Sequence, residues 1–386
     1  METKISVSLN PGAGLGYVEG VKKRGTAPSS GIAVVDARSG LPVALQPRLE
    51  EAERFLREGS HAPGTRKKYA QDFAQFEAWC GRCGVSALPA EASVVALYVH
   101  ALAAPDAANP PRTRSPGAAL RGPEPGERPL HPVSITRIVA AIRYAHGTRG
   151  LDAPTSHPLV RTALRAARRT LGVAPLRRVH AAVAEVVRRL LLGLDDSLRG
   201  RRDRALLTLG FAGAFRRAAL VSLDLDDVRS TPQGLEVRLR RDKTDVFGAG
   251  RTLPIARGQS PESCPVAAVL AWMAALRGAG FERGPLFRYI DRHGNVRPAR
   301  RESRDDRLRA QSVALVVQRR ARAVGLDPGR FAGHSLRAGF VTSAVRAGKA
   351  LPAIMGQTGH RSADTVLSYV READRWRDPA SAGLGL

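Results

Sequence analysis

Apolar residues at helical spacing are the feature that most constrains this fold. One stretch shows the spacing i, i+4, i+7 and i+11 in full: Tyr69, Phe73, Phe76 and Cys80. Thr65 precedes this stretch and is the expected N-cap of its helix. Similar apolar segments recur along most of the chain, whereas Leu235–Arg240 alternates as a half-buried strand does, and "RTLPIA" returns from it. We therefore expect a mainly α protein with a small antiparallel β-sheet.

Proline- and glycine-rich stretches divide this pattern into domains. Residues 1–46 show no sustained periodicity and are expected to form a flexible tail. The segment "VAPLRRV", residues 173–179, reads as a linker between two helical regions. The resulting division is a helical domain over 47–172 with a Pro-rich loop over 105–132, and a second domain with a C-terminal tail over 180–386.

The charge balance indicates a polyanionic partner. The chain has 61 basic and 35 acidic residues and a net charge of +26, and such a field attracts nucleic acid. An anionic membrane is the competing partner, but no apolar run is long enough to span a bilayer. The N-terminus lacks the order of a secretory signal. We expect a cytoplasmic, nucleoid-associated DNA-binding protein.

Two local sequence patterns bear on whether the chain binds a metal ion and where it contacts DNA phosphates. Cys80 and Cys83 form a CxxC pair, but there is no second pair to complete a zinc site, so we expect Cys80 to be a core residue and no metal to be bound. Several basic helix faces in the region 47–172 are candidates for DNA phosphate contacts: Arg66, Lys67, Lys68, Arg137, Arg143, Arg161, Arg165, Arg168 and Arg169.

Candidate catalytic residues are spread over the second domain. Arg216 ends an apolar helix in "GFAGAFRRAAL", and Lys243 lies near the tip of the expected hairpin. "GHSLRAGF" places a histidine and an arginine three residues apart, hence on one helix face. "TGHRSADTVLSY" adds a histidine and a tyrosine. The full set is Arg216, Lys243, His334, Arg337, His360 and Tyr369.

These segments, in this order and after a basic helical region, resemble the phage-integrase family of tyrosine recombinases over roughly residues 50–375. The resemblance implies a core-binding domain and a catalytic domain that form a C-shaped clamp on double-stranded DNA. It also implies strand cleavage and rejoining through a 3′-phosphotyrosyl link without a cofactor. Four protomers would hold two recombination sites, as in the movement of a mobile element.

The chemistry of the side chains agrees with these roles. The planar guanidinium groups of Arg216 and Arg337 suit the non-bridging phosphate oxygens. His334 and His360 can donate to those oxygens or accept the tyrosine proton. Only seven of the 61 basic residues are lysines, and a lysine can release a proton where arginine cannot, so the resemblance makes Lys243 the general acid.

Tyr369 is then the expected nucleophile. Its helix is expected to begin after Ser362 as N-cap and to bury the stripe Val366, Leu367 and Val370, with Tyr369 at the stripe's edge. A phenol ordinarily has a pKa near 10, and the neighbouring cations would favour the phenolate.

The chain departs from the family pattern at Ala219, where a supporting carboxylate is usual. Its loss could loosen Arg216 or slow the enzyme. Two alternatives stay open at this point. One is a type IB topoisomerase, which shares this kind of active site and relaxes supercoils. The other is an architectural DNA-binding protein that has lost catalysis, which Ala219 alone supports.

Overall fold

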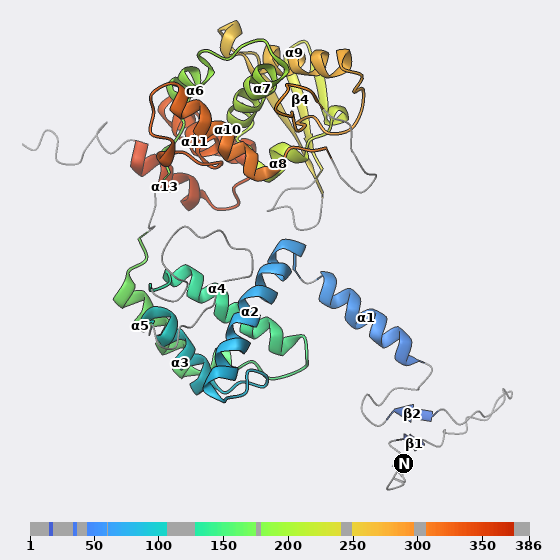
Figure 1. The fold of residues 1–386 in the computed structure, drawn as a ribbon, viewed down its shortest axis with the longest axis vertical. Coiled ribbons are helices and arrows are strands. Elements are labelled where there is room, and N and C mark those ends of the chain that lie inside the picture. Colours follow the sequence, from blue (N-terminus) through green and yellow to red (C-terminus); the bar gives the residue numbers. More distant parts are fainter. Residues whose placement is uncertain are drawn as a thin grey trace, which may run out of the picture. The chain divides into compact units, whose positions relative to one another are not determined.

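The computed structural model describes residues 15–17, 34–36, 45–59, 61–105, 128–174, 179–240, 249–296 and 306–373. The chain divides into two compact units, Met1–Leu176 and Arg177–Leu386 (Figure 1). The boundary between them falls within the predicted linker. Lys243, most of the Pro-rich loop and the C-terminal tail lie outside the described residues. Within the described segments, no helix has the length and apolarity that a bilayer crossing requires.

The first unit is built almost entirely of helices. They are α1 (Gln46–Gly59), α2 (Pro63–Cys83), α3 (Ala92–Ala103), α4 (Pro132–Gly147) and α5 (Pro158–Leu171), with one 3₁₀ turn at Pro154–Ser156. The predicted tail also contains a short antiparallel pair of strands, β1 (Leu15–Tyr17) and β2 (Val34–Asp36), with Gly16 opposite Val35. The sequence analysis missed this pair because three-residue strands show too little alternation to be recognised.

Helix α2 begins three residues earlier than expected. Pro63 occupies its first turn and Ala62 is the N-cap residue, so the expectation that Thr65 caps this helix is wrong. Proline suits the first helical position, since its fixed φ matches the helix and its missing N–H needs no partner there. The periodic residues do face inward: Phe76 and Cys80 are fully buried and pack in the core of α2–α5.

An ion pair crosses this helical core. The carboxylate of Asp72 is completely buried on α2, and Arg137 of α4 donates to it with an Nε–Oδ2 distance of 2.7 Å. Lys68, one turn before Asp72, lies 3.7 Å from the same carboxylate. The pair therefore ties α2 to α4, because a buried carboxylate needs a compensating charge.

The second unit surrounds a small sheet with helices. The helices are α6 (Ala184–Leu191), α7 (Leu198–Ala212), α8 (Arg217–Ser222), α9 (Pro265–Gly278), α10 (Ala310–Ala323), α11 (Ser335–Arg346), α12 (Leu351–Thr358) and α13 (Ala363–Ala373). The strands are β3 (Val228–Thr231), β4 (Gly234–Leu239) and β5 (Arg251–Ala256), and short 3₁₀ turns occur at Leu225–Asp227, Pro261–Ser263 and Pro328–Arg330.

The sheet has the order β3-β4-β5 and is antiparallel throughout. Val237 in the centre of β4 lies opposite Val228 on one side and Leu253 on the other. The alternating stretch thus forms the predicted strand, and the "RTLPIA" segment forms its partner β5. A mainly helical chain with a small antiparallel sheet confirms the predicted fold class.

Helix α7 runs through the middle of this unit and packs against α9 and α11 (Figure 1). Trp272 on α9 is fully buried, and its indole N–H donates to the carbonyl of Leu286 at 2.7 Å. A smaller core of Val341, Ala344, Ile354 and Val366 joins α11, α12 and α13. Val366 is buried as predicted, but Leu367 is 37% exposed, so its place in the buried stripe of α13 is wrong.

Gly339 allows the chain before α6 to pass close to α11. A Cβ at this position would lie 1.8 Å from the carbonyl oxygen of Ala182. The same segment is bonded to α11 at two other points: Ala182 N–H donates to the Ser335 carbonyl at 2.9 Å, and Ala184 N–H donates to Ser343 Oγ at 3.0 Å. The contact is thus between two backbones that cannot separate freely.

Replacing Gly339 by alanine should therefore destabilise the second unit. We expect Gly339→Ala to lower the free energy of unfolding by roughly 1–3 kcal/mol or more, as overpacking does in well-packed interiors, measured by urea denaturation. Gly356→Ala is the matched control, since a Cβ on this α12 residue meets nothing within 4 Å and alanine favours a helix by about 1 kcal/mol. Equal stability of the two variants would contradict the close approach.

Candidate active site

The phenol of Tyr369 meets His334 at the junction of α13 and α11. Tyr369 lies on α13, is half-buried, and its Oη is 3.0 Å from His334 Nε2. Ser362 begins α13 as predicted, because its Oγ accepts the N–H of Asp364 at 3.2 Å. His334 is the N-cap residue of α11. Two residues far apart in the sequence are thus within hydrogen-bonding distance through their side chains.

Arg337 is buried beneath this pair. It lies one turn into α11, is only 1% exposed, and its Nη1 donates to the carbonyl of Ala214 at 2.7 Å. Ala214 has a φ of +48°, which is uncommon for a residue with a Cβ. This left-handed residue lies in the reversal between α7 and α8, and its carbonyl anchors the guanidinium group.

Arg216 follows the same reversal and is the N-cap residue of α8. Its positive charge lowers the pKa of both His334 and His360. Desolvation, Arg337 and Arg216 lower the pKa of His334, although the residue is exposed to solvent, so the two arginines are the firmer cause. The neutral imidazole is therefore the form that faces Tyr369 at neutral pH.

His360 lies in the turn between α12 and α13. Burial, followed by the charges of Arg337, Arg216, His334 and Arg251, lowers its pKa to about 4. Thr358 Oγ1 is 2.9 Å from Nδ1 of the ring. The site thus brings both predicted histidines into the field of both predicted arginines.

Arg251 is a member of this cluster that the sequence analysis missed. Its Nη1 donates to the carbonyls of Gly356 at 2.8 Å and Gln357 at 3.3 Å at the end of α12. Gly359 has a φ of +69°, and a Cβ there would lie 2.9 Å from the guanidinium carbon of Arg251. Arg251 lies on a strand and is not part of a recognisable sequence motif. Because the chain contains so many arginines, composition does not distinguish it from the others.

Five of the predicted catalytic residues therefore come together, from the starts of α8 and α11, the turn after α12, and α13. Lys243 is not among the described residues, and its role stays a prediction. Ala219 is 7% exposed and packs in the main core, so the usual acidic position is an apolar contact here.

The predicted DNA contacts all lie in the first unit, on α2, α4 and α5. Most of these side chains are exposed: Lys67, Arg143, Arg161, Arg165, Arg168 and Arg169. Arg137 and Lys68 also contact Asp72, so part of their charge is neutralised within the unit. Phosphate contact by these residues stays a prediction.

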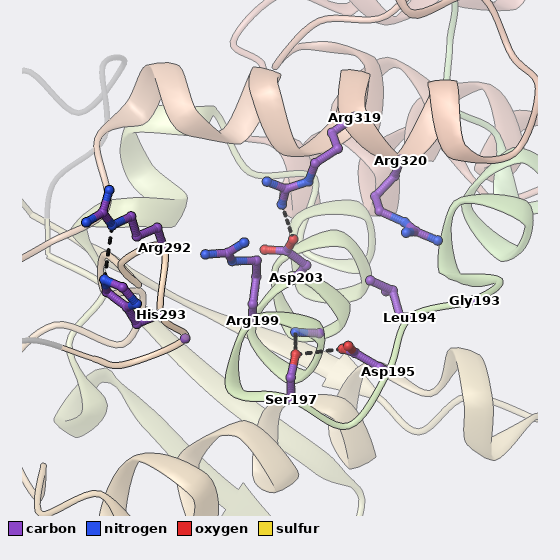
Figure 2. A pocket seen from close by; sticks show the side chains of 12 residues that line it. Gly193, Leu194, Asp195, Ser197, Arg199, Asp203, Arg292, His293, Arg319 and Arg320 are labelled. Carbon is purple, nitrogen blue, oxygen red and sulfur yellow. Dashed lines mark hydrogen bonds and ion pairs between the residues drawn. The ribbon is translucent and has the colours of Figure 1, made fainter.

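A separate polar pocket of about 460 Å³ lies where the start of α7 meets the C-terminal half of α10 (Figure 2). Buried Asp203 accepts from Arg319 across the pocket and from Arg202 beside it, with an Arg202 Nη2–Oδ1 distance of 2.7 Å. Arg320 on the same wall donates to the carbonyl of Leu190 at 3.0 Å. The arginines thus connect α10 to α7 and to the end of α6, at the opposite end of α7 from Arg216.

Comparison with known proteins places this chain in a family. A sequence profile described as the Phage integrase family matches residues 183–375. An integrase/recombinase XerD homologue from Selenomonas ruminantium is 34% identical, over 86% of this chain and 87% of the relative. The tyrosine recombinase XerC of Pseudomonas putida F1 is 30% identical, over 46% of this chain and 50% of the relative. The chain belongs to the phage integrase family of tyrosine recombinases.

Solved structures of similar proteins include integrases on DNA. The Tn1549 transposon integrase in complex with transposon right end DNA has a TM-score of 0.49 at 13% identity, over 82% of this chain and 92% of that one. A lambda integrase dimer bound to a core site has a TM-score of 0.45 at 13% identity, over 86% and 97%. The assignment rests on the sequence matches.

Membership of this family makes the chain a site-specific recombinase, an enzyme that cuts and rejoins DNA. Neither the topoisomerase nor the architectural protein considered from the sequence is favoured by these relatives. The departure at Ala219 therefore lies within a recombinase.

The low pKa of His360 should make the tyrosine recombinase less stable in acid. Below its ordinary pKa of 6.5 an unfolded histidine binds a proton that the folded ring does not bind until about pH 4, so stability falls as pH falls from about 6.5 to about 4. We expect urea denaturation at successive pH values to show a smaller decline for His360→Gln than for the wild type. Parallel declines would contradict the depressed pKa.

Asp203 should be important for stability because its removal leaves the buried Arg202 without its carboxylate partner. Arg202 is 4% exposed, and breaking a buried pair typically costs about 3–5 kcal/mol. We expect Asp203→Ala to lose that order of stability in urea denaturation.

A matched surface pair provides the control for Asp203→Ala. Arg229 donates to Glu236 with an Nη2–Oε2 distance of 2.7 Å, and the two side chains are 75% and 42% exposed. Glu236→Ala should therefore cost no more than about 1 kcal/mol. A similar loss in both variants would show that the cross-link between α7 and α10 contributes no more than a surface pair.

Proposed function

We propose that this recombinase cleaves DNA by attack of Tyr369 Oη on a backbone phosphate. The O–P bond to tyrosine forms as the bond from phosphorus to the 5′ oxygen breaks, which leaves a 3′-phosphotyrosyl link and a 5′ hydroxyl. A 5′ hydroxyl of the recombining strand then attacks the link and releases the tyrosine. The observation that carries the proposal is the 3.0 Å contact between Tyr369 Oη and His334 Nε2.

His334 is suited to receive the tyrosine proton. Desolvation and the charges of Arg337 and Arg216 lower its pKa, so the ring is neutral. In the tautomer with its hydrogen on Nδ1, Nε2 of His334 can accept the proton. The phenol needs such help because its pKa is ordinarily near 10. The same two arginines would stabilise the phenolate as it forms.

The buried arginine supports phosphate binding in a fixed geometry. The bond from Arg337 to the Ala214 carbonyl restrains the guanidinium before the substrate arrives, so little reorganisation is needed when charge develops on the phosphate. Arg216, two residues after Ala214, brings a second guanidinium to the same region. Together they would neutralise the two non-bridging oxygens, as arginine forks do for phosphates.

The remaining parts of the proposal rest on the family resemblance. Lys243 would protonate the departing 5′ oxygen, because an ammonium can release its proton where a guanidinium cannot. The exposed basic faces of α2, α4 and α5 would contact double-stranded DNA, and the two units would close around each half-site as a C-shaped clamp. Four protomers would hold two recombination sites of a mobile element, with the enzyme associated with the bacterial nucleoid.

A nicked DNA substrate tests the nucleophile directly. The substrate is nicked DNA from the region that flanks the gene for this protein. When cleavage releases the short strand beside the nick, the covalent intermediate is trapped. We expect a protein–DNA adduct that survives denaturant and maps to Tyr369 by peptide mass spectrometry. We expect Tyr369→Phe to abolish the adduct, because a ring without Oη cannot attack. Neither the wild type nor Tyr369→Phe should relax a supercoiled plasmid that lacks a recombination site.

Tyr289→Phe is the matched control for this test. Tyr289 belongs to the same unit and is 59% exposed, and we expect this variant to form the adduct as the wild type does. An adduct that persists in Tyr369→Phe would overturn the assignment of the nucleophile. Unchanged thermal unfolding of both variants would show that any loss is chemical.

A further inference from the structure

Thr358 makes two contacts that together determine where the proton of His360 lies. Thr358 is the last residue of α12 and is fully buried. Its Oγ1 lies 2.8 Å from the carbonyl oxygen of Ile354, one turn earlier, and 2.9 Å from Nδ1 of His360. Both distances are those of hydrogen bonds.

The hydroxyl has a single hydrogen to place between these two neighbours. A carbonyl oxygen can only accept, so an oxygen 2.8 Å from the Ile354 carbonyl must donate to it; otherwise two sets of lone pairs would face each other. The carbonyl of Met355 at 3.4 Å, also an acceptor, lies on the same side. Bonds from a helical threonine to the preceding turn are common. Oγ1 is therefore left as an acceptor toward the ring, and Nδ1 must carry the hydrogen.

We propose that Thr358 is a positioning residue that holds His360 in the Nδ1–H tautomer, so that Nε2 enters the reaction as a proton acceptor. A neutral imidazole has one N–H, and the other nitrogen carries a lone pair. His360 can then donate from Nε2 to a phosphate oxygen only after it has taken up a proton. This inference rests on the proposed function, the attack of Tyr369 on a phosphate, because it takes His360 to be one of the two histidines expected to donate to the phosphate oxygens or accept the tyrosine proton.

The charged groups around the ring keep this acceptor unprotonated in the free enzyme. Arg216 precedes α8, His334 and Arg337 belong to the start of α11, and Arg251 lies on β5. The three arginines disfavour a positive charge on His360, and so does His334 when it is itself protonated. A DNA phosphate brings negative charge into the same field and offsets the arginines. The pKa of His360 should then rise, and Nε2 should take a proton from solvent and become a donor to the phosphate.

Nitrogen NMR on the full-length protein tests the tautomer without any need for activity. In ¹⁵N-histidine-labelled protein near pH 7.5, protonated and unprotonated ring nitrogens have distinct shifts, and the signals of His360 are those lost in His360→Gln. We expect Nδ1 to be protonated in the wild type and in Thr358→Ser, which keeps the hydroxyl. In Thr358→Val, which has nearly the same shape but no acceptor, we expect the proton to move to Nε2 in most molecules.

The nicked-substrate assay gives a second, functional readout. Loss of the hydrogen-bond partner that fixes the tautomer of a metal-bound histidine commonly costs about 10–100-fold. By the same reasoning we expect Thr358→Val to slow adduct formation about tenfold and Thr358→Ser to restore it. Melting temperatures close to the wild type would show that both variants fold.

Two NMR results would overturn the inference: a wild-type His360 with its proton on Nε2, or a Thr358→Val protein with an unchanged tautomer. Neither result bears on whether Tyr369 forms the adduct. Conversely, an adduct that survives in Tyr369→Phe would remove the proposed function and leave the tautomer assignment standing.

Discussion

The hydrogen bond from Arg337 to the carbonyl of Ala214 is the interaction on which the site depends. It joins the start of α11 to the reversal between α7 and α8, at a point where the guanidinium is almost wholly buried. Because Ala214 adopts a left-handed conformation, its carbonyl is presented to α11 while Arg216 continues into α8. One contact thus fixes the relative positions of Arg337 and Arg216, the two arginines predicted to bind the phosphate.

The electrostatic consequence is a cluster that favours anions. Arg216 and Arg337 lower the pKa of both histidines, and the same field would lower the cost of forming a phenolate or binding a phosphate. A site that gathers several positively charged side chains suits a negatively charged substrate, since the substrate offsets their mutual repulsion. In the proposed mechanism this repulsion is present before DNA binds and is offset by the phosphate at the moment of reaction.

Local patterns predicted the elements where the signal was long and periodic, and failed where it was short. The aromatic repeat through Phe76 predicted α2, but not its first residue, because a proline at the first helical position lets the helix begin before Thr65. The alternation from Leu235 predicted β4 for a physical reason: one face of that strand is buried and the other is not. The edge of α13 was misjudged at Leu367, because a helix between a small core and solvent buries a narrower stripe than its apolar residues suggest.

The sequence by itself determined the candidate list for the chemistry, because Arg216, His334, Arg337, His360 and Tyr369 follow a recognisable order in a strongly basic chain. Only the tertiary structure decided how these residues act on one another. The contact between Tyr369 and His334, the anchor at Ala214 and the approach of Arg251 all join segments that are far apart in the chain. Local sequence patterns do not predict these long-range contacts, since they depend on how α11 packs against α7 and α13.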